Sequence, residues 1–249
     1  MPAAELYQKY ASHYLRAGNR EPDWRLAEEH PERFARHAEW LPADRSVRIL
    51  DVGCGWGNLL LSLWSAGYRR LEGIDLSFEQ AEIGHAAAEG RAAIQCSEGA
   101  PFLASHESSY DLITLMSVLE HIPPGEVVGF LQLVRRALAP GGRVVIYVPN
   151  MANLTSAWIQ SSDLTHRTFF TELSLQQALE QAGFEDHSFV KTSGRDLSAW
   201  RIWRPWRGLG LGVLANNVIH RTAYRITGQS PIPTRFEANL EVYSHRPAG

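Results

Sequence analysis

The sequence predicts a doubly wound α/β fold, in which a mostly parallel sheet is covered by helices on both faces. Short apolar segments alternate with helical patterns from residue 47 to residue 191. A glycine-rich turn follows the first apolar segment directly, as in sheets that bind a ligand beyond their carboxyl ends. With 45% hydrophobic and 20% charged residues, the chain of 249 residues has enough apolar side chains for a sizeable core. These three observations favour βαβ units and hence a parallel sheet.

The expected elements can be placed in order along the chain. Residues 1–45 are helix-rich, and one helix is expected over 23–40. Strands are expected over 47–52, 71–75, 92–96, 110–116, 143–148 and 184–191, followed by an antiparallel last strand over 237–245. Between them we expect helices over 59–66, 77–89, 125–138 and 173–182, with Ser77 as an N-cap. The segment 192–236 lies outside this alternation.

Charge and cysteine content exclude several classes of protein. Lys and Arg number 24 against 27 Asp and Glu, a net charge of -3, which disfavours a dedicated duplex-DNA binder, so no nucleic-acid partner is expected. Two cysteines, Cys54 and Cys96, are too few for a disulfide scaffold or a cysteine-rich zinc site. The polar first residues do not resemble a signal peptide, and the apolar run 209–219 is too short and too polar to cross a bilayer. We therefore expect a cytoplasmic protein.

The turn after the first strand indicates a cationic ligand rather than a phosphate. Its glycines, Gly53, Gly55 and Gly57, let a ligand approach the backbone, and the helix that follows offers unpaired N–H groups. A dinucleotide fingerprint would need glycine or alanine where Asn58 stands, and a P-loop would end in Gly-Lys-Ser/Thr. Asp51, two residues before the first glycine, suits an ammonium group and is unfavourable beside a pyrophosphate.

A second carboxylate ends the next expected strand. Asp75, in the segment GIDLS, can accept hydrogen bonds from a ribose diol. The predicted ligand therefore combines a nucleoside with an amino-acid zwitterion, and S-adenosylmethionine has both parts.

Four segments in this order resemble the class I S-adenosylmethionine-dependent methyltransferases over about residues 46–190: DVGCGWG, GIDLS, YDLITLMSVLEHI and LAPGGRVVIYVPN. The resemblance implies a Rossmann-like, seven-stranded sheet, S-adenosylmethionine as cofactor and S-adenosylhomocysteine as product. It implies that Asp51 and the glycines hold the methionine part and that Asp75 holds the ribose. Glu98 would meet the adenine amino group, where the family pattern has Asp after Gly and this chain has Glu after Ser. The full set expected at the cofactor is Asp51, Gly53, Cys54, Gly55, Gly57, Asp75, Leu76, Glu98, Gly99, Ala100 and Met116.

Two histidines are candidates for a general base, since a hydroxyl acceptor profits from losing its proton. His121 lies in a Leu-Glu-His-Ile segment that many such methyltransferases share, and a structural role is the alternative for it. His166 and Asp163 lie in an Asp-x-Thr-His segment which, with residues 170–175 and 182–184, resembles a bacterial subgroup associated with glycan biosynthesis. This suggests His166 as the base and Asp163 as its orienter or a substrate ligand, and a local turn pair is the alternative. No metal is expected, because a site of Asp163, His166 and His121 has no specific spacing.

The acceptor is expected to meet Tyr10, Tyr14, Glu120, Asn150 and Arg167. In similar enzymes the N-terminal helices close the site and exclude water, which suggests a lid role for Tyr10 and Tyr14. Packing of the same helix on the sheet edge explains their spacing equally well.

The segment 192–236 is basic and rich in tryptophan. Residues 197–236 include six arginines and no Asp or Glu, and Trp200, Trp203 and Trp206 lie close together. Three alternatives stay open: peripheral contact of 200–225 with a membrane or a lipid-linked acceptor, a wall or lid for the substrate, and packing on the core or in a homodimer.

The chain is thus divided into an N-terminal helical lid (1–45), an S-adenosylmethionine-binding methyltransferase core (46–191), the basic insertion (192–236) and the last strand with a tail (237–249). The predicted function is O-methylation of a sugar, a glycan precursor or another polar small molecule, with histidine-assisted deprotonation. A quinone-like or lipid-linked acceptor at the membrane surface is an alternative. A cofactor-binding pseudoenzyme or partner subunit is the non-catalytic alternative, and Asn58 and Asp51 disfavour a nicotinamide-dependent oxidoreductase.

Overall fold

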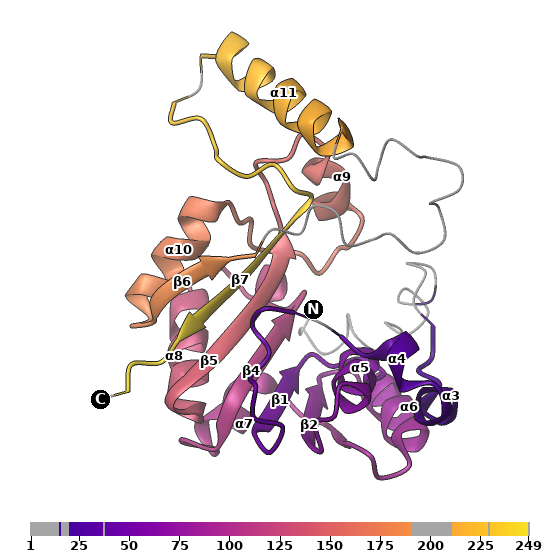
Figure 1. The fold of residues 1–249 in the computed structure, drawn as a ribbon. Helices are drawn as coiled ribbons and strands as arrows, with labels where there is room; N and C mark the ends of the chain where they lie inside the picture. The colour runs from indigo at the N-terminus through magenta and orange to yellow at the C-terminus, as the bar shows by residue number, and fades with distance from the viewer. Residues whose placement is uncertain (1–14, 16–19, 37, 191–210, 229, 249) are drawn as a thin grey trace.

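A computed structural model describes residues 15, 20–36, 38–190, 211–228 and 230–248. Its centre is a seven-stranded sheet in the order β3-β2-β1-β4-β5-β7-β6 (Figure 1). β7 is antiparallel to both of its neighbours, β5 and β6, and the pairs among β1 to β5 are parallel. This confirms the predicted fold class. The strands are β1 (Arg48–Val52), β2 (Arg70–Asp75), β3 (Ala93–Cys96), β4 (Tyr110–Met116), β5 (Leu138–Pro149), β6 (Glu185–Phe189) and β7 (Asn239–His245).

Helices cover both faces of the sheet, and each face has its own apolar core. Successive side chains of a strand point to opposite faces of the sheet, so each strand contributes to both cores. In β1, Ile49 packs with one core and Leu50 with the other. One core is closed by α3 (Trp24–Glu29), α5 (Asn58–Ser65) and α6 (Phe78–Ala88), and the other by α7 (Gly99–Ala104), α8 (Val127–Ala137) and α10 (Glu172–Gln181). The remaining described helices are α4 (Pro31–Phe34), the short η1 (Leu119–His121), α9 (Ser156–Ser161) and α11 (Leu211–Ile226).

Two expected elements differ in extent from the prediction. The helix expected over 23–40 is broken into α3 and α4 at His30, because the residue before a proline is disfavoured in the helical conformation. The strand expected over 143–148 is the second half of a longer β5, which begins at Leu138 and pairs irregularly with β4. Pro140 lies in that irregular part, where a missing N–H does not interrupt a regular ladder. The short helices α7 and α9 were not expected from periodicity.

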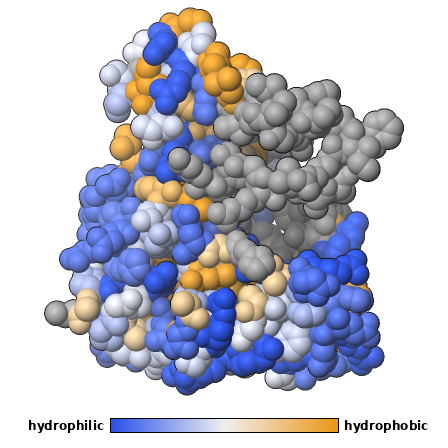
Figure 2. Space-filling view, viewed as in Figure 1, coloured by the Kyte–Doolittle hydropathy of each residue, from blue (hydrophilic) through white to orange (hydrophobic). Residues whose placement is uncertain are grey.

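The helix α11 lies apart from the sheet, beyond the carboxyl ends of the parallel strands (Figure 1). One side of it is attached to the core: the His220 Nε2 accepts the Leu154 N–H at 2.9 Å, and the Tyr224 hydroxyl donates to the Ala152 carbonyl at 3.2 Å. Apolar side chains, including Val218 and Ile219, are exposed elsewhere on α11, whereas most of the surface around the sheet in the same view is hydrophilic (Figure 2). Within the described part of the chain, no helix has the length and apolarity that crossing a bilayer requires.

The strand order places a ligand site between β1 and β4. β2 and β3 follow β1 on one side, and β4 and β5 lie on the other, so the helices that leave β1 and β4 diverge. The register puts Asp51 beside Thr114 of β4 and beside Gly73 of β2. The polar ends of these strands therefore meet in one crevice.

Substitution of two glycines tests how closely the glycine loop packs against the apolar core. Gly57 has φ +85°, and a Cβ there would lie 2.7 Å from Ile94 Cδ1. Gly90 has nearly the same φ, +80°, and open space around the Cβ position, which makes it a matched control. We expect Gly90→Ala to lower the free energy of unfolding by about 1–2 kcal/mol through backbone strain alone. Gly57→Ala should cost about 1–3 kcal/mol more, because the core must also make room.

Urea denaturation of the two variants and the wild type measures the difference. Equal losses of stability in the two variants would contradict the close packing of the loop against Ile94.

Candidate active site

A cavity of about 1160 Å³ opens at the carboxyl ends of β1, β2, β4 and β5. A typical small-molecule pocket measures roughly 300–1,000 Å³, so this one has room for a cofactor and an acceptor together. Most residues expected at the site do line it. They are Asp51, Gly53, Cys54, Gly55, Asp75, Leu76, Glu98, Gly99, Ala100, Met116, Glu120, His121, Asp163 and His166.

Asp75 holds the glycine loop in place. Its Oδ2 accepts the Gly55 N–H and its Oδ1 accepts the Ser77 N–H, both at 2.8 Å. Gly53 in the same loop has φ +71°, and a Cβ there would lie 2.7 Å from the Val118 side chain. Glycine is therefore required at this position for both conformation and space. Because each carboxylate oxygen can accept a second hydrogen bond, Asp75 can also accept from the hydroxyls of a ribose.

Asp51 is a buried carboxylate at the end of β1, and its side chain accepts a hydrogen bond from the Thr114 hydroxyl at 2.6 Å. Burial raises the pKa of Asp51 to about 7, and the nearby charge of Asp75 adds to this rise, while Thr114 and Arg36 oppose it. An ammonium group placed in the cavity would favour the ionised form again. The electrostatics of this end of the cavity therefore suit a cationic ligand.

Leu76 and Glu98 also line the cavity. Leu76 follows β2, is exposed and lines the cavity, so it offers an apolar surface. Glu98 is the N-cap residue of α7, but its side chain makes no capping hydrogen bond. Its carboxylate is thus not used by the helix. Leu76 can therefore offer an apolar contact and Glu98 a hydrogen-bond acceptor to a planar base in the cavity.

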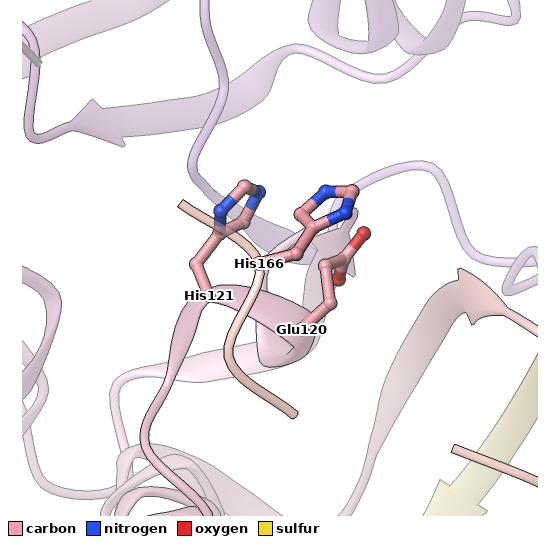
Figure 3. Close-up of side chains that lie close together, drawn as sticks. All are labelled: Glu120, His121 and His166. Carbon is pink, nitrogen blue, oxygen red and sulfur yellow. The ribbon is translucent and has the colours of Figure 1, made fainter. Parts of the chain in front are cut away.

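The other end of the cavity contains Glu120, His121 and His166 (Figure 3). One possible ligand atom from each residue lies within 4.8 Å of the others, and the two imidazole centroids are 4.9 Å apart. Glu120 and His121 come from η1, directly after β4, whereas His166 comes from the loop that follows α9. Backbone hydrogen bonds join the two segments, since the N–H groups of Arg167 and Thr168 donate to the Glu120 carbonyl at 2.7 and 3.0 Å.

Both imidazoles are oriented through Nδ1. The His166 Nδ1 lies 3.2 Å from the Gln160 carbonyl, which can only accept, so Nδ1 is protonated and the Nε2 of neutral His166 has a lone pair. The His121 Nδ1 lies 2.8 Å from the Thr165 hydroxyl, which donates its single proton to Asp163 Oδ1 at 2.6 Å. The hydroxyl therefore accepts from His121. Asp163 thus orients His121 through Thr165.

Burial dominates the electrostatics of this cluster. It lowers the pKa of His121 to about 4, with further lowering by His166. It also raises the pKa of Glu120 to about 8. Both groups therefore favour their neutral forms at neutral pH when nothing else is bound.

Three expected site residues do not line the cavity. Gly57 begins α5 and is packed under Ile94, as described above. The Asn150 amide is buried and donates to the carbonyls of Arg235 and Glu237 at 3.1 and 2.9 Å, so it holds the start of the 235–239 segment. Arg167 is exposed and reaches Glu120 only through its backbone. Tyr10 and Tyr14 lie outside the described residues.

Two further residues of the cavity wall, Arg36 and Tyr147, were not predicted from the sequence. Arg36 comes from the segment after α4, and its guanidinium donates to Glu241 Oε1 at 3.3 Å. Tyr147 comes from β5 and borders the same space. Neither lies in a recognisable motif, because only the tertiary fold brings these segments to the crevice.

The comparisons with known proteins identify the family of the chain. A model described as "Methyltransferase domain" matches residues 9–188. The chain belongs to this methyltransferase domain family. The class I resemblance predicted from the four motifs is thereby confirmed.

Solved structures show the same fold for this methyltransferase. A SAM-dependent methyltransferase of Archaeoglobus fulgidus has a TM-score of 0.57 at 18% identity, over 89% of this chain and 92% of that one. One of Thermotoga maritima has a TM-score of 0.62 at 15% identity, over 97% and 98%. Haemonchus contortus phosphoethanolamine N-methyltransferase 2, with a TM-score of 0.54 at 16% identity over 90% and 53%, was solved with S-adenosyl-L-methionine. The expected cofactor is thus confirmed as that of the family.

Curated relatives include two ubiquinone biosynthesis O-methyltransferases. That of Idiomarina loihiensis is 26% identical over 153 residues, or 56% of this chain and 62% of its own length. That of Aromatoleum aromaticum is 36% identical over 125 residues, or 43% and 47%. The match therefore spans less than two thirds of either relative. Neither name supports the expected assignment to polysaccharide biosynthesis.

The pKa of Asp51 predicts how cofactor binding depends on pH. Because Asp51 is protonated below pH 7 in the free protein and must be ionised to pair with an ammonium group, affinity should fall as pH drops below about 7. At most, the affinity falls about tenfold for each pH unit below this value. Calorimetry with S-adenosylhomocysteine between about pH 5.5 and 8.5 measures this slope. Asp51→Asn should bind more weakly and lose the slope, and an unchanged slope in the variant would assign it to another group.

Removing the Asp75 carboxylate should weaken cofactor binding further. Asp75→Ala loses a charged acceptor for the ribose and two bonds that hold the glycine loop. A hydrogen bond to a charged group is worth about 1.5–3 kcal/mol, so the dissociation constant for S-adenosylhomocysteine should rise roughly 10- to 150-fold. Ser77→Ala is the control, because it removes the α6 cap and keeps the carboxylate. Equal affinities in Asp75→Ala and wild type would exclude Asp75 from the cofactor site.

Proposed function

We propose that this chain transfers the methyl group of S-adenosylmethionine to a hydroxyl group on an aromatic, quinol-like acceptor. The single observation that supports this most is one cavity with two chemically different ends. Asp51 and Asp75 line one end, and the Glu120, His121 and His166 cluster lines the other. The first end suits a sulfonium amino acid joined to a nucleoside, and the second suits a group that must lose a proton.

The wall near the cluster favours an aromatic ring over a sugar. Ile122 and Pro123 follow the cluster in the chain, Ile159 comes from α9 and Tyr147 from β5, and all four line the cavity. A ring packed between such side chains gains from apolar burial and aromatic contact. A sugar would leave its several hydroxyls facing apolar groups, which is costly without partners. The names of the curated relatives point in the same direction.

Methyl transfer itself depends mainly on alignment. The acceptor oxygen, the methyl carbon and the sulfonium sulfur must lie in line, and holding them so supplies much of the rate. As the new O–C bond forms, the C–S bond breaks and its electron pair stays on sulfur, which leaves S-adenosylhomocysteine. The acceptor proton passes to the lone pair on Nε2 of neutral His166, to which we assign the role of general base, with Glu120 and His121 as its neighbours in the cluster.

Asp163 and Thr165 act in this proposal as positioning residues. They hold the His121 ring through Nδ1 and do not need to touch the acceptor. Tyr10 and Tyr14 of the predicted lid lie outside the described residues, and no described residue of the predicted insertion, 192–236, lines the cavity.

The assay is methyl transfer from labelled S-adenosylmethionine to a panel of acceptors: catechols and hydroxylated quinols, simple sugars, and amines. We expect turnover with the first class. His166→Ala should lose about 100-fold or more in kcat, the usual size of acid–base effects, while the affinity for S-adenosylhomocysteine stays within about threefold. His85→Ala is the control, because it removes an exposed histidine on α6 that does not line the cavity.

Methylation of sugars but not of phenolic hydroxyls would overturn the acceptor class. Full turnover in His166→Ala would overturn the assignment of proton removal to the cluster.

A further inference from the structure

The Glu120, His121 and His166 cluster has the donor atoms and spacing of a metal site. Its three donors lie within 4.8 Å of one another, one carboxylate oxygen and two imidazole nitrogens (Figure 3). Two donors at about 2.1 Å from one tetrahedral ion lie roughly 3.4 Å apart, so the donor atoms would have to draw together by up to about 1.4 Å. Rotation of the three side chains would have to supply this movement.

The hydrogen bonds around the cluster are those that metal-binding histidines need. A ligating imidazole usually donates its other N–H to a carbonyl or to a carboxylate-linked group, which fixes the ring and directs the second nitrogen to the ion. The His166 Nδ1 donates to the Gln160 carbonyl, and the His121 Nδ1 donates to Thr165, which is held by Asp163. The His166 ring is therefore held in the tautomer whose Nε2 carries a lone pair, and the His121 ring is fixed in orientation by Thr165.

A second, independent observation is an unpartnered oxygen. The Glu120 side chain is buried, with 1% exposure, and its Oε2 has no hydrogen-bond partner. A buried polar atom without a partner is unfavourable, because it has lost its hydrogen bonds to water without replacing them. Binding a cation at this oxygen would remove that cost, and the carboxylate lines the same cavity as both histidines.

We propose that Glu120, His121 and His166 bind one divalent transition-metal ion at the acceptor end of the cavity. Two imidazoles and one carboxylate are the donors that suit zinc, cobalt or iron(II), whereas magnesium and calcium prefer oxygen donors throughout. Three protein ligands leave at least one position of the ion open, as in catalytic rather than structural sites. The open position faces a cavity that the acceptor can enter.

This inference rests on the proposed function in one respect, the identity of the incoming ligand. With an ion bound, His166 would be a ligand and not the base: the acceptor hydroxyl would occupy the open position, and its proton would pass to solvent, because a divalent ion lowers the pKa of a coordinated oxygen. Methyl transfer to that oxygen would break the C–S bond, and sulfur would keep the electron pair. No oxidant or reductant is needed, and the ion keeps its charge throughout.

The test is binding of Co²⁺ to the full chain with S-adenosylhomocysteine and no acceptor. Visible absorption reports the geometry of the cobalt, and calorimetry reports its stoichiometry. We expect one Co²⁺ per chain, displaced by Zn²⁺. His166→Ala and Glu120→Gln should each bind at least 10-fold more weakly, and His85→Ala should bind like the wild type.

A pair of variants at Thr165 tests the support of His121. Thr165→Val removes the hydroxyl between His121 and Asp163 at nearly constant volume and should weaken Co²⁺ binding 10- to 100-fold, the usual cost of losing such a partner. Thr165→Ser keeps the hydroxyl and should restore binding. The affinity for S-adenosylhomocysteine shows in each case that the variant is folded.

The outcomes separate this inference from the proposed function. If the wild type binds no Co²⁺ or Zn²⁺, or binds it no better than His166→Ala, the metal site is overturned, even if chelator-resistant methylation of a quinol shows that the proposed function holds. If Co²⁺ binds as expected and no hydroxyl acceptor is methylated, the metal site stands and the proposed function falls.

Discussion

The site depends on two carboxylates at the ends of adjacent strands, the buried Asp51 and the half-buried Asp75. Burying Asp51 and Asp75 beside each other is unfavourable, because each loses hydration and each repels the other. The fold offsets part of this cost with the Thr114 hydroxyl and with the N–H groups of Gly55 and Ser77. What remains is a negative potential directed into a cavity, which favours a cationic ligand.

The glycine loop has this conformation because of the same constraint. Gly55 donates to Asp75 across the gap between β1 and β2, so the loop must turn sharply at the end of β1. The positive φ of Gly53 and the close approach of Val118 leave no room for a side chain in that turn. The sharp turn that the Gly55–Asp75 hydrogen bond requires therefore explains both the glycines of the loop and the position of Asp75 at the cavity. The donor half of the site is built almost entirely from backbone and from residues next to strands.

The acceptor half is assembled differently. Glu120 and His121 are fixed by β4, but His166 arrives from a loop 45 residues later, and the two segments are joined by hydrogen bonds to the Glu120 carbonyl. Side chains from α9 and β5 complete the wall. Loops of this kind can change without disturbing the sheet, which is why acceptors differ widely among proteins with one fold. The chemistry of the cluster, rather than the fold, must therefore identify the acceptor.

The amino-acid sequence by itself determined the sheet and the donor half of this site. Apolar runs of strand length, the glycine turn and Asp75 are local patterns, and in a parallel sheet the carboxyl ends of the strands meet without any further information. It did not determine the break at His30, the role of Asn150 inside the core or the recruitment of Arg36 and Tyr147. Those depend on which distant segments pack together. Only the tertiary structure brought Glu120 and His166 within reach of each other, because the contact joins segments with no common periodicity and is decided by packing and by a few long-range hydrogen bonds.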